Sequence, residues 1–249
     1  QQYESYYDNT SPRHNCFPKH IYRKYHMRIN LVTCTDWNYR RWAITLLNSL
    51  HDQYQTKYVI GVGEGDWDSF GSDLNVTVIK QPFNHAMDPV LWCQNVRMRH
   101  MRALIQNADY LLQVDADVRQ NKFFDIKQFT KFNISAVTKQ KGKGNSPVDP
   151  RFRINAGWVL YKNTTKVLEI LEKIQQDFDN TYNNQTQWEQ TILDKYFPLC
   201  NSVPHRFVDD GSKGGFMKDS TWYHCKGPGR KQNTDLDSWH DLSMTPKLT

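Results

Sequence analysis

The residues of this sequence best suited to chemistry are paired aspartates. Asp-x-Asp occurs four times, but only Asp115 and Asp117 directly follow an apolar run, YLLQV. In an extended chain, residues two apart project to the same side, with their Cα atoms about 6–7 Å apart. Two carboxylates held that close repel each other unless a cation lies between or beside them. Their hard oxygen atoms suit Mn²⁺ or Mg²⁺, ions that also bridge phosphate oxygens.

The position of this pair in the chain separates it from the other copies. A pair of acids that ends a buried strand lies where parallel α/β sheets bind ligands. A metal at that position makes a diphosphate a good leaving group, because it stabilises the charge that develops there. The copies that follow no buried strand are interpreted as solvated turn aspartates. They are Asp66/Asp68, Asp177/Asp179 and Asp235/Asp237.

Two segments further along the chain carry candidate sugar-binding groups. In RINAGWVLYKN, Asn155 can offer an amide to a sugar hydroxyl, and Gly157 allows close approach of a ligand to the backbone. An ordinary turn before a strand is the alternative interpretation. In TQWEQTIL, Glu189 and Gln190 lie early in an expected helix. Glu189 can serve as a base, a nucleophile or an acceptor-holding group, or can simply favour the helix dipole.

A third segment, WYHCKGPGRK, combines a histidine with a basic glycine-containing loop. His224 is a candidate third metal ligand through its imidazole. Gly227 frees the backbone to curl around a phosphate. Positive charge for a diphosphate would come from Lys226, Arg230 and Lys231.

Alternating apolar runs and helical periodicities must position these groups. Strands are expected at 27–35, 57–62, 75–79, 109–118, 134–137 and 158–161, and helices at 39–51, 87–106, 165–178 and 187–196. Asp36 is expected to cap the first helix. The order predicts an α/β fold with a doubly wound, mostly parallel sheet and helices on both faces. We expect a single domain over 27–249, preceded by an irregular arm over 1–26.

Composition limits the function less than the motifs do. The 249 residues carry a net charge of +6, which suits phosphate-bearing or polyanionic ligands without choosing among them. No run of about 20 apolar residues is present, so no segment is expected to span a bilayer. The five cysteines form no CxxC pair, which argues against a zinc module and leaves both disulfides and free thiols open.

The cellular compartment stays open at this point. Sequons for N-glycosylation occur at Asn9, Asn75, Asn133, Asn163 and Asn184, and their number favours a lumenal setting only slightly. A Golgi or secretory lumen, reached through an N-terminal anchor that was removed, and the cytoplasm are both compatible with the sequence.

Taken in order, LLQVDADV, INAG, WEQ, SVPHRF and HCKGPGRK resemble the motifs of GT-A-fold glycosyltransferases. The layout is most similar to retaining families eight (glycogenin-like) and thirty-four, and the resemblance covers roughly residues 27–231. It implies that Asp115, Asp117 and His224 hold a Mn²⁺ or Mg²⁺ ion. It also implies that Gly227 and Lys231 contact the donor diphosphate.

The same resemblance assigns the remaining donor contacts. Asn155, Gly157 and Gln190 would line the sugar pocket. The end of the first strand, represented by Thr33, Thr35 and Asp36, would contact the nucleoside. Arg97 lies near the position of a donor-contacting arginine in such families, with Arg99 as the rival. The sequence departs from family eight in having Glu189-Gln190 in place of Asp-Gln and Arg230 at the expected lysine.

The expected reaction is sugar transfer from a nucleoside-diphosphate sugar, of UDP or GDP type, to a hydroxyl of a glycan, a protein or another acceptor. Nucleic acid stays open as an acceptor. The resemblance implies retention of configuration, while Glu189 as a base would give inversion. A sugar-1-phosphate nucleotidyltransferase is a second hypothesis, but TDWNYRRW after Thr33 lacks its Gly-rich phosphate loop. A non-catalytic binding module is a third, disfavoured because all three candidate ligands are present.

Overall fold

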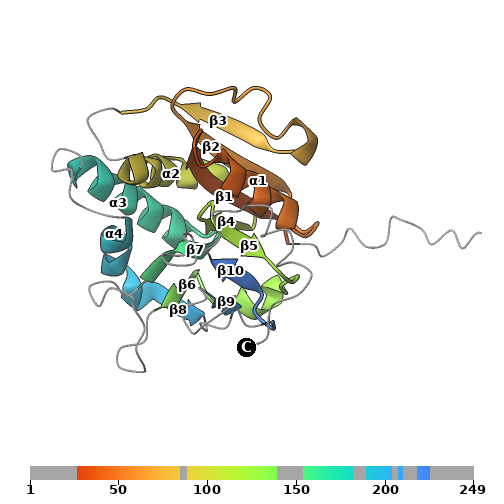
Figure 1. Ribbon diagram of the computed structural model, residues 1–249. Helices are drawn as coiled ribbons and strands as arrows, with labels where there is room; N and C mark the ends of the chain where they lie inside the picture. The colour runs from red at the N-terminus through yellow and green to blue at the C-terminus, as the bar shows by residue number, and fades with distance from the viewer. Residues whose placement is uncertain are drawn as a thin grey trace, which may run out of the picture.

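The computed structural model describes residues 27–84, 89–138, 154–181, 189–203, 207–209 and 218–224. Their centre is a seven-stranded sheet of order β3-β2-β1-β4-β7-β6-β8 (Figure 1). Its strands are β1 (Ile29–Asp36), β2 (Thr56–Val62), β3 (Thr77–Gln81), β4 (Tyr110–Val114), β6 (Ile134–Thr138), β7 (Ile154–Lys162) and β8 (Cys200–Val203). Only β7 runs against its neighbours β4 and β6, so the expected mostly parallel α/β sheet is confirmed.

The central strands are buried along nearly their whole length, as strands covered on both faces must be. In β1, seven of the eight residues are buried, and all five residues of β4 are. Because β2 and β4 both pair in parallel with β1, on opposite sides of it, the chain changes direction across the sheet between β1 and β4. Ligands bind at such a switch point, beyond the carboxyl ends of the strands.

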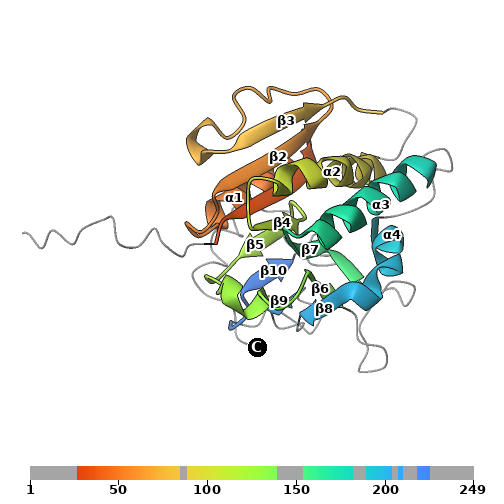
Figure 2. The ribbon, with the colours of Figure 1, turned by 180° about the vertical axis from the view of Figure 1, so that it is seen from behind.

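Helices cover both faces of the sheet, as the pattern predicts. Helix α1 (Arg40–Ser49) lies on one face, while α2 (Pro89–Ile105), α3 (Thr165–Thr181) and α4 (Glu189–Lys195) lie on the other (Figures 1 and 2). Helix α3 shows the reason for burial most clearly. Its buried residues recur at helical spacing and join one apolar cluster with β1, β4 and β7. They are Val167, Ile170, Leu171, Ile174 and Phe178.

A second, three-stranded sheet packs on the face that carries α1. It contains β5 (Val118–Gln120), β9 (Val208–Asp209) and β10 (Trp222–His224), with β10 in the middle. Its core is aromatic: Trp222 lies 6.4 Å from Trp158 of β7 and 6.1 Å from Phe124, measured between ring centroids. The strands expected from the sequence end at residue 161, so β9 and β10, which are two and three residues long, are not among them.

The expected element boundaries need two further corrections. The strand expected over 109–118 is interrupted, since β4 ends at Val114 and β5 begins at Val118. The strand expected over 158–161 begins earlier, at Ile154, so Asn155 and Gly157 lie inside β7. Asp36 does not cap α1 directly: its Oδ1 accepts a hydrogen bond from the backbone N–H of Tyr39, the residue before the helix.

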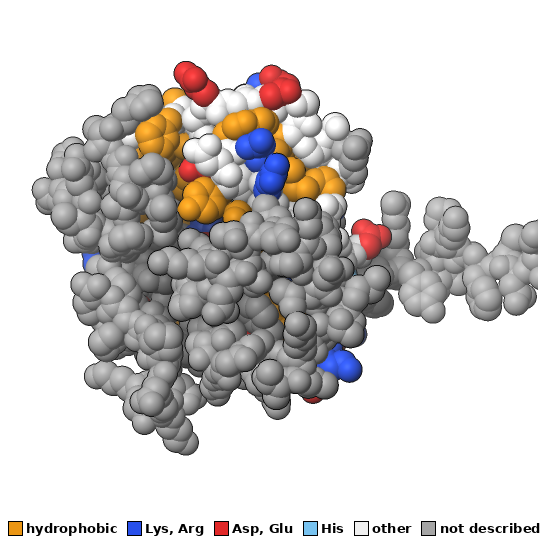
Figure 3. Space-filling view, in the orientation of Figure 1, with side chains coloured by type: hydrophobic (Ala, Val, Ile, Leu, Met, Phe, Trp, Pro, Cys, Tyr) orange, Lys and Arg blue, Asp and Glu red, His pale blue; other side chains and the backbone are white. Residues whose placement is uncertain are grey.

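Several sequence features fall on the surface or outside the described residues. In Figure 3, basic side chains lie among hydrophobic ones in the upper part of the view, where β2, β3 and α1 are found, and acidic side chains lie along its upper edge. None of the described helices combines the length and hydropathy needed to cross a bilayer. Within the described part of the chain, Cys34, Cys93 and Cys200 take part in no disulfide. The arm over 1–26 and the loop over 225–231 lie outside the described residues.

Candidate metal centre

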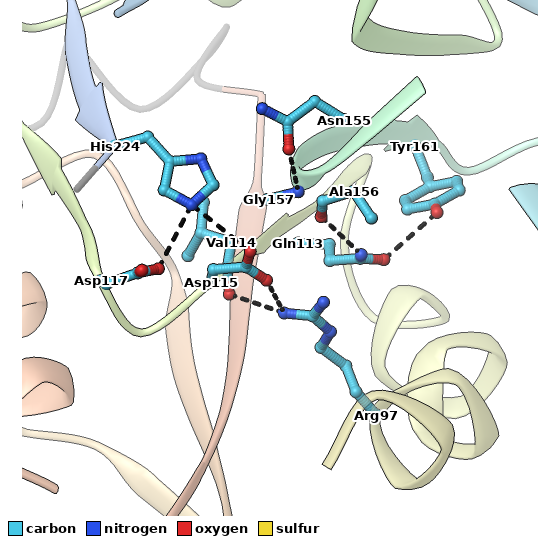
Figure 4. Close-up of polar contacts among 10 residues, drawn as sticks. All are labelled: Arg97, Gln113, Val114, Asp115, Asp117, Asn155, Ala156, Gly157, Tyr161 and His224. Carbon is cyan, nitrogen blue, oxygen red and sulfur yellow. Dashed lines mark hydrogen bonds and ion pairs between the residues drawn. The ribbon is translucent and has the colours of Figure 1, made fainter. Parts of the chain in front are cut away.

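Asp115, Asp117 and His224 come together at the carboxyl end of β4. One ligand atom from each lies within 4.8 Å of the others, and among the described residues this is the group suited to hold a metal ion. The Nε2 atom of His224 lies 3.3 Å from Oδ1 of Asp117 and 3.5 Å from Oδ2 of Asp115 (Figure 4). Ligands at neighbouring corners around an ion with bonds of about 2.1 Å are about 3 Å apart. The three side chains are therefore close to a coordinating arrangement.

A turn brings the two carboxylates together, in place of the extended chain that the sequence pattern implies. β4 ends at Val114, and the backbone N–H of Val118 donates to the carbonyl of Asp115 across 3.1 Å. This tight turn contains Asp117, and β5 follows directly. Alternation along a strand is therefore the wrong reason for their convergence, although the two residues do converge.

The small sheet delivers His224. In the β5–β10 ladder, His224 pairs with Val118, the residue that follows Asp117. A ladder partner fixes the position of a side chain relative to the opposite strand, because cross-strand neighbours have Cβ atoms about 4.5–5.5 Å apart. The ligand lies 107 residues after Asp117 in the sequence. Pairing between short strands therefore completes the cluster.

The chemistry of the cluster fits a divalent cation. The His224 ring is fully buried, and neither of its nitrogens has a hydrogen-bond partner among the described residues. A buried polar atom without a partner costs about 1–3 kcal/mol, which coordination through a ring nitrogen would offset. Carboxylate and imidazole ligands together suit Mn²⁺ and are compatible with Mg²⁺.

Gly157 of β7 closes one side of the cluster, and it has no room for a side chain. A Cβ placed there would lie 2.7 Å from Nδ1 of His224 and 2.8 Å from Oδ2 of Asp115, and closer still to Cε1 of the histidine. The carbonyl of Gly157 also accepts from the backbone N–H of Asp115 at 3.1 Å. Glycine is needed here for close approach, as the sequence predicts, but the neighbours are two candidate metal ligands.

Arg97 of α2 is buried beneath the carboxylates. Its side chain is 2% exposed, and Nη1 donates to Oδ1 of Asp115 and to the carbonyl of Val114, each at 3.0 Å. A guanidinium at this distance neutralises one of the two carboxylates, which lets them stay close to each other. The rival Arg99 lies at the surface and pairs with Asp179 of α3.

The other expected site residues are placed unevenly. Thr33 and Thr35 are buried, and of the three residues at the end of β1 only Asp36 has appreciable exposure. Oδ1 of Asn155 accepts from the N–H of Gly157 at 3.0 Å. Glu189 and Gln190 begin α4, but their side chains are outside the description. The basic loop residues also lie outside the described residues. They are Lys226, Gly227, Arg230 and Lys231.

Four residues are missing from the sequence-based prediction of the site and its surroundings. Gln113 and Tyr161 form a buried pair behind Gly157, with the Tyr161 hydroxyl donating to Oε1 of Gln113 at 3.2 Å. Gln113 is visible in the sequence as the one polar residue in YLLQV, two residues before Asp115. Tyr39, after the end of β1, is 46% exposed, whereas most aromatic side chains in the described core are covered. Burial raises the pKa of Tyr223, so this neighbour of His224 stays uncharged at neutral pH.

Compared by sequence, the chain matches no protein-family model and no curated protein. Compared by structure, it is similar to the galactosyltransferase LgtC, crystallised with donor and acceptor sugar analogues, at a TM-score of 0.57 and 15% identity over 88% of this chain and 97% of LgtC. It is also similar to the glycosyltransferase GlyE of Streptococcus pneumoniae TIGR4, at a TM-score of 0.58 and 17% identity over 88% of this chain and 60% of GlyE.

A third similar structure is a glycosyltransferase involved in glycosylation of the major capsid of PBCV-1, at a TM-score of 0.54 and 12% identity over 85% of this chain and 99% of that one. At these identities the likeness concerns the backbone. The mixed α/β layers, with their large and mostly parallel sheet, therefore have the GT-A-like fold of glycosyltransferases.

Proposed function

We propose that this protein is a metal-dependent glycosyltransferase, which moves a hexose or pentose from a nucleoside-diphosphate sugar to an acceptor hydroxyl. The observation that carries the proposal is the Asp115–Asp117–His224 cluster at the switch point of a glycosyltransferase fold. The fold alone would be compatible with other activities. Buried ligands at the place where such sheets bind nucleotides support this particular one.

In the proposed site, Asp115, Asp117 and His224 hold a Mn²⁺ or Mg²⁺ ion. The bound ion would stabilise the negative charge that develops on the departing diphosphate. Arg97 keeps Asp115 oriented and partly neutralised through its bond to Oδ1. The absence of a side chain at Gly157 lets β7 pack directly against the cluster.

The donor is expected to lie across the carboxyl ends of β1 and β4. Asp36 is the most exposed of the predicted nucleoside contacts, and the exposed ring of Tyr39 follows it. An exposed aromatic face can stack on a nucleobase, which is worth about 1–3 kcal/mol. UDP- and GDP-sugars both fit this description. Lys226, Arg230 and Lys231 would neutralise the diphosphate as it leaves.

The order of the motifs supports a relationship to retaining families eight and thirty-four, and we therefore propose transfer with retention. In this proposal Asn155 and Gln190 contact the sugar, and Glu189 holds the acceptor. Inversion with Glu189 as the base is the alternative. The stereochemistry of a product formed from an α-linked donor separates the two, because inversion would give the β-anomer.

The proposal is tested by screening nucleotide-sugars for donor hydrolysis in the presence of Mn²⁺ or Mg²⁺. We expect hydrolysis of at least one UDP- or GDP-sugar, loss of activity with a chelator, and a decrease of about a hundredfold or more in Asp117→Ala. The matched control is Asp68→Ala, which removes an aspartate from another Asp-x-Asp copy at the surface. Hydrolysis that survives both the chelator and Asp117→Ala would contradict the proposal.

A further inference from the structure

β7 departs from regular pairing beside the metal cluster. Ala136 and Val137 are adjacent in β6, yet they pair with Val159 and Asn155 of β7. The three β7 residues at 156–158 therefore have no partner in β6. A bulge of this kind bends a strand and redirects its side chains, and bulges are frequent next to active sites. Here the bulge contains Gly157, the residue in contact with two candidate ligands.

Side chains hold the bulged segment on both sides of Gly157. The Nε2 atom of Gln113 donates to the carbonyl of Ala156 at 2.9 Å, and the N–H of Gly157 donates to Oδ1 of Asn155 at 3.0 Å (Figure 4). Gln113 is fully buried. Burying an amide costs free energy unless it is hydrogen-bonded, so an apolar residue would be simpler here if packing were the only requirement.

The Ala156 carbonyl fixes which way the Gln113 amide points, and the hydroxyl of Tyr161 supports that orientation from the other side. A carbonyl oxygen can only accept a hydrogen bond, so the NH₂ group of Gln113 must face Ala156. Its Oε1 then faces Tyr161, whose hydroxyl donates to it at 3.2 Å. Tyr161 is itself fully buried in the apolar cluster beneath α2 and α3. Without the hydroxyl, Oε1 of Gln113 would lose this hydrogen bond, and the amide would hold the Ala156 carbonyl less firmly.

We propose that Tyr161 and Gln113 are positioning residues of the metal centre, which act by holding the β7 bulge so that Gly157 fits against His224 and Asp115. The inference rests on the proposed function in so far as that function requires the metal. It extends the site to two residues that contact neither the donor nor the ion. Residues one layer behind metal ligands commonly change metal affinity by about 10–100-fold.

The test is isothermal titration of Mn²⁺ alone into the full chain and its variants, combined with thermal unfolding without metal. Tyr161→Phe should bind Mn²⁺ about tenfold more weakly than the natural protein. Gln113→Met, which keeps the length of the side chain and removes the amide, should lose at least as much. The matched control is Tyr54→Phe, since the Tyr54 hydroxyl donates to Oε1 of another buried glutamine, Gln120, at 2.9 Å.

We expect Tyr54→Phe to lower the unfolding temperature about as much as Tyr161→Phe does and to leave the Mn²⁺ affinity unchanged. Unchanged Mn²⁺ affinity in folded Tyr161→Phe or folded Gln113→Met would overturn the inference. So would equal losses of affinity in Tyr161→Phe and Tyr54→Phe, because the effect would then be a general loosening. The natural protein tests the proposed function separately. If it binds no Mn²⁺, the proposed metal dependence is contradicted, whatever the variants show.

Discussion

At the scale of single residues, the site depends on how closely groups of different kinds can approach. The two carboxylates tolerate each other because Arg97 lies beneath one of them, and the nitrogens of the buried His224 ring have no hydrogen-bond partner in the described part of the chain. Gly157 is the third contributor, because it has no side chain that would overlap His224 and Asp115. The His224 nitrogens favour the arrangement when a cation binds them. The Arg97 contact and the close fit at Gly157 favour it while the neighbouring groups keep their positions.

Gly157→Ala is the sharpest residue-scale test of this geometry. The added methyl group would overlap His224 and Asp115, so we expect the Mn²⁺ affinity measured by titration to fall by at least about tenfold. Overpacking should also cost about 1–3 kcal/mol of unfolding free energy.

The matched control for this prediction is Gly61→Ala in β2. A Cβ at Gly61 would lie 2.5 Å from the Trp67 ring, so the variant is overpacked in the same way but away from the cluster. We expect a comparable loss of stability without a change in Mn²⁺ affinity. Normal Mn²⁺ binding by Gly157→Ala would show that the cluster can shift to accept a side chain, contrary to the tight fit described.

At the scale of elements, two asparagines hold α2, which carries Arg97, in register with the sheet. The last carbonyls of a helix have no partner within it. Nδ2 of Asn30 in β1 donates to the Leu104 carbonyl at 2.7 Å. Nδ2 of Asn163, directly after β7, donates to the carbonyls of Ile105 and Ala108 at 3.0 and 2.8 Å. These contacts join the end of α2 to both halves of the chain.

Asn163→Ala should therefore destabilise the fold. Removing the amide that donates to the Ile105 and Ala108 carbonyls predicts a decrease of about 1–3 kcal/mol in the free energy of unfolding, measured by urea denaturation. Asn133→Ala is the control, because Oδ1 of Asn133 accepts only a longer bond, 3.4 Å, from Thr164. Equal stabilities for the two variants would mean that water replaces the Asn163 amide at the end of α2. Both residues belong to sequons, and Asn163 is the one whose amide is fully engaged.

The elements also show where sequence reasoning succeeds and where it stops. β1 and β4 can be predicted from the sequence because they are apolar and buried on both faces. Helix α3 can be predicted because its apolar residues keep helical spacing. Asp115 and Asp117 can be recognised as candidate ligands because they end such a strand. The turn between them cannot be predicted, since its geometry depends on the Asp115 carbonyl accepting a hydrogen bond from the N–H of Val118. Strands as short as β9 and β10 have no periodicity to recognise.

At the scale of the whole molecule, the centre exists only when two sheets meet. Asp115 and Asp117 lie between the large sheet and β5, while His224 comes from β10 at the far end of the described chain. His224 can be proposed from its motif, but no local pattern indicates that it pairs opposite Val118. The contributions of Arg97 and Tyr161 are equally non-local, since they depend on α2 packing over the sheet and on β7 pairing with β4. Such contacts follow from the complete topology.

Because its ligands are far apart in the sequence, the centre should bind metal in the folded state and hardly at all in the unfolded chain. A ligand that binds only the folded state stabilises it by about 2.7 kcal/mol at a hundred times its dissociation constant. For a domain of this size, that corresponds to an increase of about 5–10 °C in the unfolding temperature. Differential scanning calorimetry with increasing Mn²⁺ should show this increase, and excess chelator should reverse it.

Asp117→Asn should abolish the increase, because it removes the charge of one ligand while keeping nearly the same shape. Asp68→Asn should retain it, since Asp68 is exposed and pairs only with Lys80 among the contacts described. An equal increase in both variants would place the stabilising ion elsewhere on the molecule. Because the measurement needs neither donor nor acceptor, it tests whether the two sheets together build a metal site before the sugar chemistry is known.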